Sequence, residues 1–423
     1  MIRKARILVL AHSPSQGGAE RALQSLIKSC PEYYWEIVFP VAPFTQVELV
    51  DGIDMYHQIP LPWWCYEANS SPQPTNRKEL NNSLEALSKL VEKADVLLTN
   101  TITIPWLGFI ARELNKPHIW YIHEFGDIDH NLQFIGGYEN SIKTIGACSN
   151  RILTISTAVK AHLSTYVNAE QIDIIHQSVD LKNLLKIPMT DKPAYQSLLC
   201  LGAIKPSKGQ LIALNAVQSL PGSNFSLDIC GPNANDAYLQ QLLKSKQSDH
   251  VRIVPGFSPQ VELLSSHDIV LMCSDNEALG RVTLEALAAG KLVIGYDCLS
   301  TRDLLGDNRG ILYSPNTSKA LATVLSNVAT IDTVDRQKAR KFVEEVYSSK
   351  RQSKDFTSCL VKARNRAIPK TNPQLTAASY IGILDALGVP DSSEKTFSQS
   401  IRSVAARVLS KRVKNLLKSF LER

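Results

Sequence analysis

Two glutamates, Glu277 and Glu285, are separated by eight positions in the second half of the chain. The sequence predicts that the first follows a strand over 269–272 and that the second lies inside a helix that begins at Gly280. Ligands of open α/β sheets bind beyond the carboxyl ends of the strands, where one carboxylate can orient sugar hydroxyls and the other can hold a ribose. The backbone N–H groups that can face a phosphate at this helix start belong to Leu279, Gly280, Arg281 and Val282.

An alternative interpretation of these two glutamates needs no ligand. Acidic residues favour the start of a helix because they interact well with its dipole, and the second glutamate can simply be exposed. The spacing alone therefore leaves a binding site and an ordinary acidic helix start both open.

A second loop that could bind a ligand contains Gly17 and Gly18, between a predicted strand over 6–11 and a predicted helix over 19–30. Glycines allow the backbone to approach a ligand, and the first N–H groups of a helix attract anions, so we expect a phosphate or acceptor loop here. An ordinary turn is the alternative. The spacing differs from Gly-x-Gly-x-x-Gly, which argues against a dinucleotide-dependent dehydrogenase.

Two further pairs of side chains are weaker candidates. Asp127 and Asp129 could hold a divalent cation against a diphosphate, but a solvated acidic loop is the simpler explanation and we expect no metal. Trp63 and Trp64 lie in a loop-like segment and could stack on an acceptor sugar, whereas packing in the core is the alternative.

Short apolar runs that alternate with helix-length segments must position these side chains. The strand candidates lie at 6–11, 96–99, 119–122, 152–155, 197–201, 226–230, 251–254, 269–272 and 292–294. Such alternation favours parallel sheets covered by helices on both faces. The pattern restarts after a polar segment over 181–195 that contains Pro188 and Pro193, so we predict an α/β fold with two doubly wound domains.

The segment around Glu277 resembles the retaining glycosyltransferases of family 4, or glycosyl transferases group 1, whose signature is Glu-x7-Glu followed by an Ala-Gly-x-x-Val-Ile-like stretch. Four further segments fit the family in order: GGAERALQSL, IWYIHE, LGAIKPSKGQ and VYSSKRQSKDF. The resemblance covers residues 5–365 and implies the GT-B fold, in which two Rossmann-like domains face each other across a cleft. It implies a hexosyltransferase that moves a sugar from a nucleotide diphosphate sugar to a glycan or lipid-linked acceptor with retention of configuration.

The resemblance also implies roles for individual residues. Glu277 would hold the donor sugar and Glu285 the ribose. His123, in IWYIHE, would contact the donor sugar or the reacting centre, and Lys208, in LGAIKPSKGQ, would contact the phosphate. Because Lys208 and the helix-start N–H groups can stabilise the charge that grows on the leaving diphosphate, we expect neither a metal nor a cofactor.

The chain departs from the family pattern at three places. Ala203 stands where the family usually has an arginine that pairs with the diphosphate, and Lys205 is a nearby cation that could substitute. Residues 176–180 match only at their last two positions, and Cys298–Thr301 replace the usual Gly-Gly. A non-catalytic sugar-nucleotide-binding or scaffold protein therefore remains an alternative, as does a GT-B hydrolase or phosphorylase-like enzyme.

We predict four regions along the 423 residues. Residues 1–185 form an acceptor-side Rossmann-like domain, and residues 196–355 form a Rossmann-like domain that binds the nucleotide sugar. A helix over 356–366 returns to the first domain, and an extension over 367–423 ends in a basic amphipathic helix.

The charge of the chain is concentrated in this extension. Lys plus Arg total 46 and Asp plus Glu total 40, a net charge of +6, and residues 401–423 alone contribute seven basic side chains and one acidic side chain. A neutral body argues against nucleic-acid binding, whereas the basic amphipathic segment could bind an anionic membrane surface or pack on the body.

Cysteine usage and hydropathy indicate the compartment. The eight cysteines are scattered without metal-ligand spacing, which is typical of buried free thiols in a reducing environment. We find no signal-peptide pattern and no apolar run long enough to span a membrane. We therefore expect a cytoplasmic protein that could associate with the cytoplasmic face of a membrane through its tail.

Overall fold

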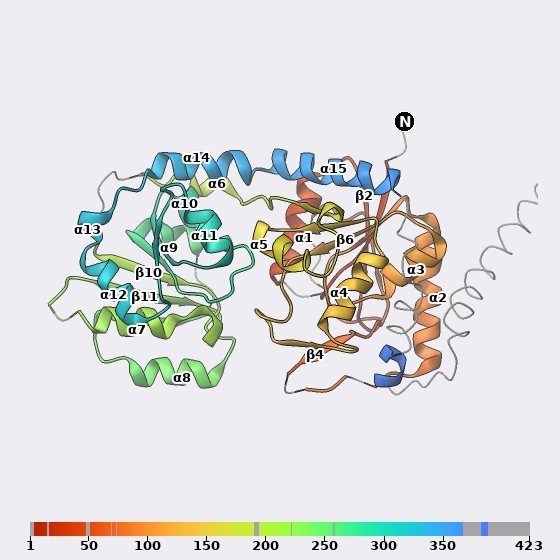
Figure 1. Ribbon diagram of the computed structural model, residues 1–423, viewed down its shortest axis with the longest axis horizontal. Helices are drawn as coiled ribbons and strands as arrows, with labels where there is room; N and C mark the ends of the chain where they lie inside the picture. The colour runs from red at the N-terminus through yellow and green to blue at the C-terminus, as the bar shows by residue number, and fades with distance from the viewer. Residues whose placement is uncertain are drawn as a thin grey trace, which may run out of the picture. The chain divides into compact units, whose positions relative to one another are not determined.

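The computed structural model of the chain describes residues 4–14, 17–47, 51–68, 70–72, 74–189, 194–220, 222–256, 259–366 and 382–387. The chain divides into two compact units (Figure 1). The first unit comprises Met1–Gln177 and Gln352–Arg423, and the second comprises Ser178–Arg351. The predicted basic helix over 401–423 lies outside the described residues, as does most of the predicted extension.

The first unit is built on a parallel seven-stranded sheet with the strand order β3-β2-β1-β5-β6-β8-β9. Its strands are β1 (Arg6–Leu10), β2 (Tyr34–Phe39), β3 (Met55–Gln58), β5 (Val96–Thr99), β6 (His118–Ile122), β8 (Arg151–Thr154) and β9 (Ile172–Ile174). The central strands β5 and β6 are buried along their whole length. Such continuous burial is expected for parallel strands that are covered by helices on both faces.

The helices of the first unit cover both faces of this sheet. They are α1 (Gly18–Ser29), α2 (Arg77–Lys93), α3 (Trp106–Leu114), α4 (Tyr138–Ala147), α5 (Thr157–Leu163) and the greater part of α15 (Ser349–Asn365). Right-handed crossovers that run in opposite directions from β1 place α1 on one face and α3 on the other. A separate antiparallel pair joins β4 (Cys65–Glu67) to β7 (Leu132–Phe134).

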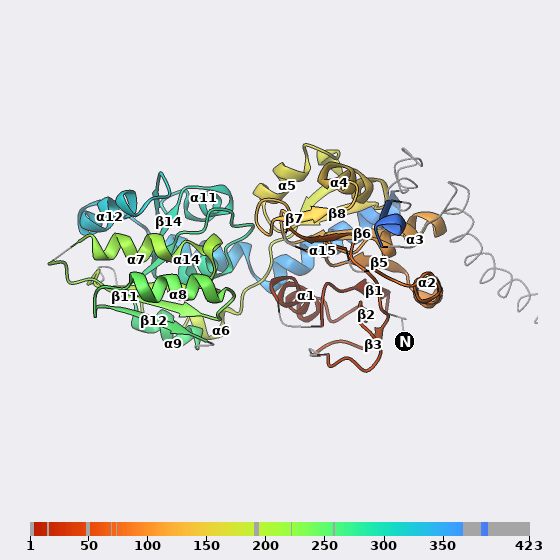
Figure 2. The same cartoon turned by 90° about the horizontal axis from the view of Figure 1, so that it is seen from below.

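The second unit repeats this plan with a parallel six-stranded sheet in the order β12-β11-β10-β13-β14-β15. Its strands are β10 (Ser197–Leu201), β11 (Ser226–Gly231), β12 (Val251–Pro255), β13 (Ile269–Met272), β14 (Leu292–Tyr296) and β15 (Ile311–Tyr313). Its helices are α6 (Leu181–Leu184), α7 (Gln210–Gln218), α8 (Asp236–Ser245), α9 (Gln260–Ser266), α10 (Arg281–Ala288), α11 (Leu299–Leu305), α12 (Ser318–Ser326), α13 (Val328–Ile331) and α14 (Arg336–Val346). Figure 2 shows α7 and α8 with β11 and β12 of this unit in a second view.

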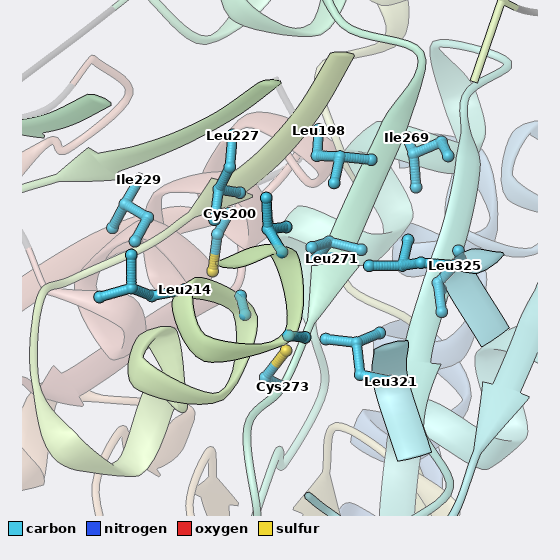
Figure 3. Packing of buried hydrophobic residues seen from close by; sticks show 14 of the residues in the cluster. Leu198, Cys200, Leu214, Leu227, Ile229, Ile269, Leu271, Cys273, Leu321 and Leu325 are labelled. Carbon is cyan, nitrogen blue, oxygen red and sulfur yellow. The ribbon is translucent and has the colours of Figure 1, made fainter. Parts of the chain in front are cut away.

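The main core of the second unit lies between its sheet and helices α7, α8 and α12. Leu198 and Cys200 of β10 and Leu271 of β13 face Leu214 of α7 and Leu321 of α12 (Figure 3). These side chains are almost completely buried, so they hold β10, β13 and α7 in fixed positions. The loops that follow β10 and β13 are therefore anchored at their origins.

Each sheet reverses its strand order at one point. In the first unit the chain builds outward from β1 through β2 and β3 and then returns to add β5 on the other side of β1. In the second unit β10 and β13 have the same relation. Ligands of doubly wound sheets bind outside the carboxyl ends of the strands at such a switch point. The loops after β1, β5, β10 and β13 are therefore the places to search for a site.

The predicted strands agree closely with the observed strands. β5, β10 and β13 begin and end as predicted, and β1, β6, β8, β11, β12 and β14 differ by one or two residues at an end. The sequence analysis missed β2, β3, β9, β15 and the β4–β7 pair. Most of these strands are short, and β3 is largely exposed, so they lack a long apolar run.

The boundaries between the units differ from the predicted positions at 185 and 355. The chain enters the second unit at Ser178, before the predicted linker, because α6 packs on α10 and the Arg340 side chain donates to the carbonyl of Ile187 at 3.0 Å. It returns to the first unit at Gln352, inside α15. The returning helix is therefore Ser349–Asn365 rather than 356–366.

The cysteines agree with the predicted free thiols. None of the eight forms a disulfide bond, seven are buried, and Cys298 is partly exposed. Of the extension, the structure describes residues 382–387, where the Leu387 carbonyl accepts a hydrogen bond from the Thr75 amide at 3.0 Å. Among the described residues, no helix combines the length and the apolar character needed to cross a bilayer.

Candidate functional site

Lys208 and Glu277 meet at the switch point of the second unit. Lys208 ends a short 3-10 turn after β10, and Glu277 lies in the loop after β13. The Lys208 Nζ atom donates to Glu277 Oε2 at 2.7 Å. The side chains keep 30% and 13% of their surface exposed, so the pair is shielded but can still be reached by a ligand.

A left-handed glycine brings the two loops together. Gly209 has φ +65°, and a Cβ atom on it would lie 2.3 Å from the carbonyl oxygen of Cys273 at the end of β13. Any other side chain would force the loops apart. Gly209 therefore fixes the position of Lys208 against the loop that carries Glu277.

Gly280 allows the Glu277 loop to lie close to the start of α10. It has φ +80° and caps the helix without a side-chain hydrogen bond. A Cβ atom on it would lie 3.4 Å from Glu277 Cγ, so Glu277 lies against the helix N-terminus. Two buried polar atoms of the first helical turn, Arg281 Nη1 and Thr283 Oγ1, have no hydrogen-bond partner. Unsatisfied donors of this kind at a helix N-terminus can serve an anion.

Glu285 lies one helical turn after Arg281 on α10, and two side chains contact its carboxylate. The Gln260 amide of α9 donates to Glu285 Oε2, and the Arg281 guanidinium lies 3.7 Å from Glu285 Oε1. Leu279 and Val282 flank Gly280 and Arg281, so the four predicted backbone positions do lie together at the start of α10. The structure thus brings Lys208, Glu277 and Glu285 to one edge of one sheet.

Residues outside the predicted site support the Glu277 loop. Ser300 donates to the Ala278 carbonyl at 2.6 Å, and Asn316 donates to the Cys273 carbonyl at 3.1 Å. The Cys298 thiol donates to the Asp275 carbonyl at 3.0 Å. The segment Cys298–Thr301, which departs from the family pattern, therefore stabilises the loop through hydrogen bonds to its carbonyl groups.

At the position of the missing arginine, Ala203 has a half-buried methyl side chain. The backbone carbonyl of Ala203 accepts a hydrogen bond from the Gln210 side-chain amide at 2.8 Å. Lys205 is also half-buried and precedes the turn that ends in Lys208. Two lysines of one loop thus lie close to the site where one arginine was expected.

His123 lies in the first unit, directly after β6. Its Nε2 donates to Asn100 Oδ1 at 2.9 Å, and its Nδ1 accepts from the Gln177 amide at 3.2 Å. Burial lowers the pKa of His123 to about 3, so the imidazole is neutral at physiological pH. Both ring nitrogens are engaged, and one hydrogen bond must break before a ligand can contact either of them.

A second histidine, His12, follows β1 and was not singled out by the sequence. Its Nδ1 is joined by hydrogen bonds to Thr101 Oγ1 at 2.8 Å and Thr103 Oγ1 at 3.2 Å. The Trp63 ring lies against it, with 4.8 Å between ring centroids. Burial lowers the pKa of His12 to about 4. No local pattern could have found it, because its hydrogen-bond partners Thr101 and Thr103 follow β5 and are 89 and 91 residues away in the sequence.

The loop at Gly17 and Gly18 differs from a phosphate cradle. Gly17 caps α1, and Glu20 lies in the first turn of this helix. A Cβ atom on Gly17 would lie 2.4 Å from Glu20 Oε2. The chain's own carboxylate therefore occupies the helix N-terminus, where a phosphate would be repelled.

The aspartates and the second tryptophan have structural roles. Asp129 accepts from the amides of Phe125 and Gly126 at 2.9 and 2.7 Å, and Asp127 accepts from His162 Nε2 at 3.2 Å. Among the described residues no group of three metal-ligating side chains lies together. Trp64 is fully buried, in agreement with the core-packing interpretation, whereas the neighbouring Trp63 is exposed.

Comparison with known proteins identifies the second unit. Residues 190–348 match the family model described as "Glycosyl transferases group 1". This part of the chain is a glycosyl transferases group 1 domain, and it contains Lys208, Glu277 and Glu285. No curated protein matches the chain.

Solved structures share the fold of both units. Anabaena HepE in complex with UDP and glucose has a TM-score of 0.67 at 16% identity, covering 84% of this chain and 99% of its own. A glycosyltransferase from Rickettsia africae has a TM-score of 0.66 at 17% identity, with 85% and 98% covered. The lipopolysaccharide outer core galactosyltransferase WaaB, in its apo form, has a TM-score of 0.61 at 17% identity, with 84% and 99% covered. The predicted GT-B fold class with Rossmann-like domains is confirmed.

Proposed function

We propose that this chain, whose residues 190–348 form a glycosyl transferases group 1 domain, is a glycosyltransferase that uses a nucleotide diphosphate sugar as donor. The observation that carries the proposal is the Lys208–Glu277 pair at the switch point of the second unit, with Glu285 on the adjoining helix. The UDP and UDP-glucose complexes of the structural neighbour HepE support the choice of donor class.

The donor would separate Lys208 from Glu277, and each residue would then contact a different part of the donor. Lys208 would contact the diphosphate, and Glu277 would accept hydrogen bonds from hydroxyls of the donor sugar. Before a donor arrives, each group satisfies the other, so neither is left as an unpaired charge. The donor would replace one ion pair by a phosphate contact and a set of hydroxyl contacts.

Glu285 would accept hydrogen bonds from the ribose. The Gln260 amide and the Arg281 guanidinium restrict its carboxylate to one orientation, which lowers the entropy cost of binding the diol. Gln260 and Arg281 would then act as positioning residues for Glu285.

The chemical step needs stabilisation of a leaving diphosphate. The bond from the sugar C1 to the β-phosphate oxygen breaks with its electron pair on the phosphate, and the acceptor oxygen bonds to C1. Lys208, Lys205 and the first N–H groups of α10 would stabilise that charge without a metal. The acceptor proton would pass to the departing diphosphate, so no side chain is assigned as a general base.

The assignment of His123 to the donor sugar or the reacting centre remains part of the proposal. Because the Gln177 amide occupies Nδ1, a substrate hydroxyl would displace that amide to reach the ring. The neutral imidazole would then act as a hydrogen-bond acceptor rather than as a cation.

The finer features of the proposal concern stereochemistry, acceptor and location. The resemblance to family 4 supports retention and a hexose as the transferred group. A glycan or lipid-linked acceptor is supported by WaaB, a lipopolysaccharide galactosyltransferase with a similar structure. The seven basic residues of 401–423 support contact with an anionic membrane surface at the cytoplasmic face.

A donor-consumption assay tests the proposal. The protein would be incubated with UDP-, GDP- and ADP-sugars, with and without a membrane extract that supplies acceptors. We expect consumption of one nucleotide class that requires the extract. Glu277→Ala should abolish it, whereas Glu262→Ala, an exposed acid on α9, should leave it unchanged.

Other outcomes would support the two alternatives. Consumption without any acceptor would indicate a hydrolase or phosphorylase-like enzyme. Binding of a nucleotide sugar without turnover under any acceptor would indicate a sugar-nucleotide-binding or scaffold protein, for which the missing arginine at Ala203 is the supporting observation.

A further inference from the structure

We propose that Trp63 and His12 form a binding site for an uncharged sugar ring on the first unit, and that this ring is the acceptor. The inference rests on the proposed function, because a transferase needs an acceptor site separate from its donor site. The site is built by the segment that follows β5, which contacts the residues after β1 and those after β6.

Trp63 is held as a rigid platform. On one side of it the Trp64 amide donates to the Thr103 carbonyl at 3.1 Å, and on the other the Trp106 indole donates to the Pro62 carbonyl at 2.6 Å. The Trp63 side chain is nevertheless 38% exposed. Hydrogen bonds hold the backbone on both sides of this exposed indole, so the segment loses little entropy when a sugar ring stacks on it.

His12 supplies a hydrogen bond beside this platform. Thr101 and Thr103 both bind its Nδ1, which leaves Nε2 as the ring nitrogen that a ligand can meet. Because the ring is neutral at physiological pH, it pairs with a hydroxyl group without attracting anions.

A carboxyl group next to the site disfavours an anionic ligand. Glu124 accepts from the Ile102 amide at 3.2 Å, and its pKa is raised to about 7 by burial and, to a smaller extent, by Asp129 and Glu20. Glu20 Oε1 is buried and has no hydrogen-bond partner. Because Ile102 lies between Thr101 and Thr103, the partners of His12, the Glu124 carboxyl group lies next to the site, where it disfavours a phosphate in its ionised form and can accept a hydrogen bond from a sugar hydroxyl.

The position in the fold agrees with this chemistry. His12 follows β1 and Thr101 follows β5, so their hydrogen bond crosses the switch point of the first sheet. The corresponding point of the second sheet carries Lys208 and Glu277. The two switch points therefore differ in character, since the one in the first unit is acidic and aromatic and the other contains a lysine.

Saturation-transfer NMR on the full chain in the presence of UDP tests the inference. The probes are the methyl glycosides of glucose, galactose, mannose and N-acetylglucosamine, with glycerol 3-phosphate as the anionic probe. We expect at least one glycoside to bind and glycerol 3-phosphate not to bind. Trp63→Ala should weaken glycoside binding about tenfold, and Trp63→Phe, which keeps a ring, by about threefold or less. Phe44→Ala removes a 99% exposed aromatic elsewhere on the unit and should change nothing.

Two results would overturn the inference: preference for glycerol 3-phosphate, or equal glycoside binding by Trp63→Ala and the unaltered chain. An unchanged unfolding temperature for Trp63→Ala would exclude a folding defect. The UDP signal reports separately on the proposed function. If UDP binds and glycoside binding does not depend on Trp63, only the proposed acceptor site is wrong. If no nucleotide binds, the transferase proposal and the acceptor role fail together.

Discussion

At the scale of single residues, the proposed donor site depends on the ion pair between Lys208 and Glu277. A lysine that faced the solvent alone would be strongly hydrated, and a carboxylate in a shielded loop would lose hydration without compensation. Their 2.7 Å contact stabilises both groups, and in the proposed function a diphosphate would compete with Glu277 for the lysine. Removing either residue therefore changes the other, and a single substitution reports on the pair.

Lys208→Ala should lower kcat/KM for the donor by about 10²-fold, because the leaving charge loses its nearest cation and Glu277 is left unpaired. Lys208→Arg should recover part of the loss. Steady-state kinetics with the preferred donor measure both variants. Lys244→Ala, which removes an exposed lysine of α8, is the matched control, and an equal loss there would contradict the assignment.

Glu124 should make the stability of the chain depend on pH. Its pKa is raised from 4.5 to about 7, so the folded state binds more protons than the unfolded state between these values, and stability from this group falls as pH rises from about 4.5 to 7. His12 and His123, with lowered pKa values, change stability in the opposite direction over an overlapping range. Glu124→Gln isolates the contribution of the carboxyl group.

Thermal unfolding between pH 5 and 8 measures this effect. The melting temperature of Glu124→Gln minus that of the unaltered chain should increase as pH rises, by a few degrees across the range. A difference that stays constant with pH would contradict the raised pKa.

At the level of elements, the sequence predicts what short-range pattern can determine. The runs 197–201 and 269–272 are continuous and apolar, and they became β10 and β13 without shift. Glu277 and Lys208 were found because a family signature surrounds them. His12 and Asn316 were missed because their partners, Thr101 and Cys273, lie far away in sequence. The sequence left stacking and core packing both open for Trp63 and Trp64. Adjacent residues in an extended segment point to opposite sides, so one ring entered the core and the other did not.

Gly209→Ala should damage the site through backbone geometry. The left-handed conformation costs a non-glycine residue roughly 1–2 kcal/mol, and the new Cβ atom would meet the Cys273 carbonyl at 2.3 Å. We expect lower stability and weaker donor binding, because Lys208 must move. Gly222→Ala is the control, since Gly222 has φ +79° with nothing within 4 Å of an added Cβ. Equal donor affinity in both variants would show that the Gly209 contact does not position Lys208.

At the scale of the whole molecule, α15 returns the chain from the second unit to the first. Phe356 stacks on Trp35 with 5.7 Å between ring centroids, and Gln352 accepts from Ser25 and Ser29 at 2.8 and 2.9 Å. Lys362 pairs with Asp173 at 2.7 Å. The first unit is thus completed by residues that follow the second unit in the sequence.

Phe356→Ala should destabilise the first unit by about 3–5 kcal/mol, because it leaves a cavity against a buried tryptophan. Hydrogen exchange should show lost protection in α1 and β2 and retained protection in β10 and β13. Val361→Ala, at a position 54% exposed on the same helix, should have little effect. Loss of protection in both units alike would show that they do not behave as separate compact bodies.

The central claim is that Lys208 and Glu285 hold the two ends of a nucleoside diphosphate on the second unit. Titration calorimetry with UDP, GDP and ADP tests it directly. We predict that one nucleotide binds the unaltered chain and that Lys208→Ala and Glu285→Ala each weaken its Kd by about tenfold, or about 1.4 kcal/mol. Lys244→Ala and Glu262→Ala should bind as the unaltered chain does. The claim is contradicted if no nucleotide binds, or if Lys208→Ala and Glu285→Ala bind the nucleotide with unchanged affinity.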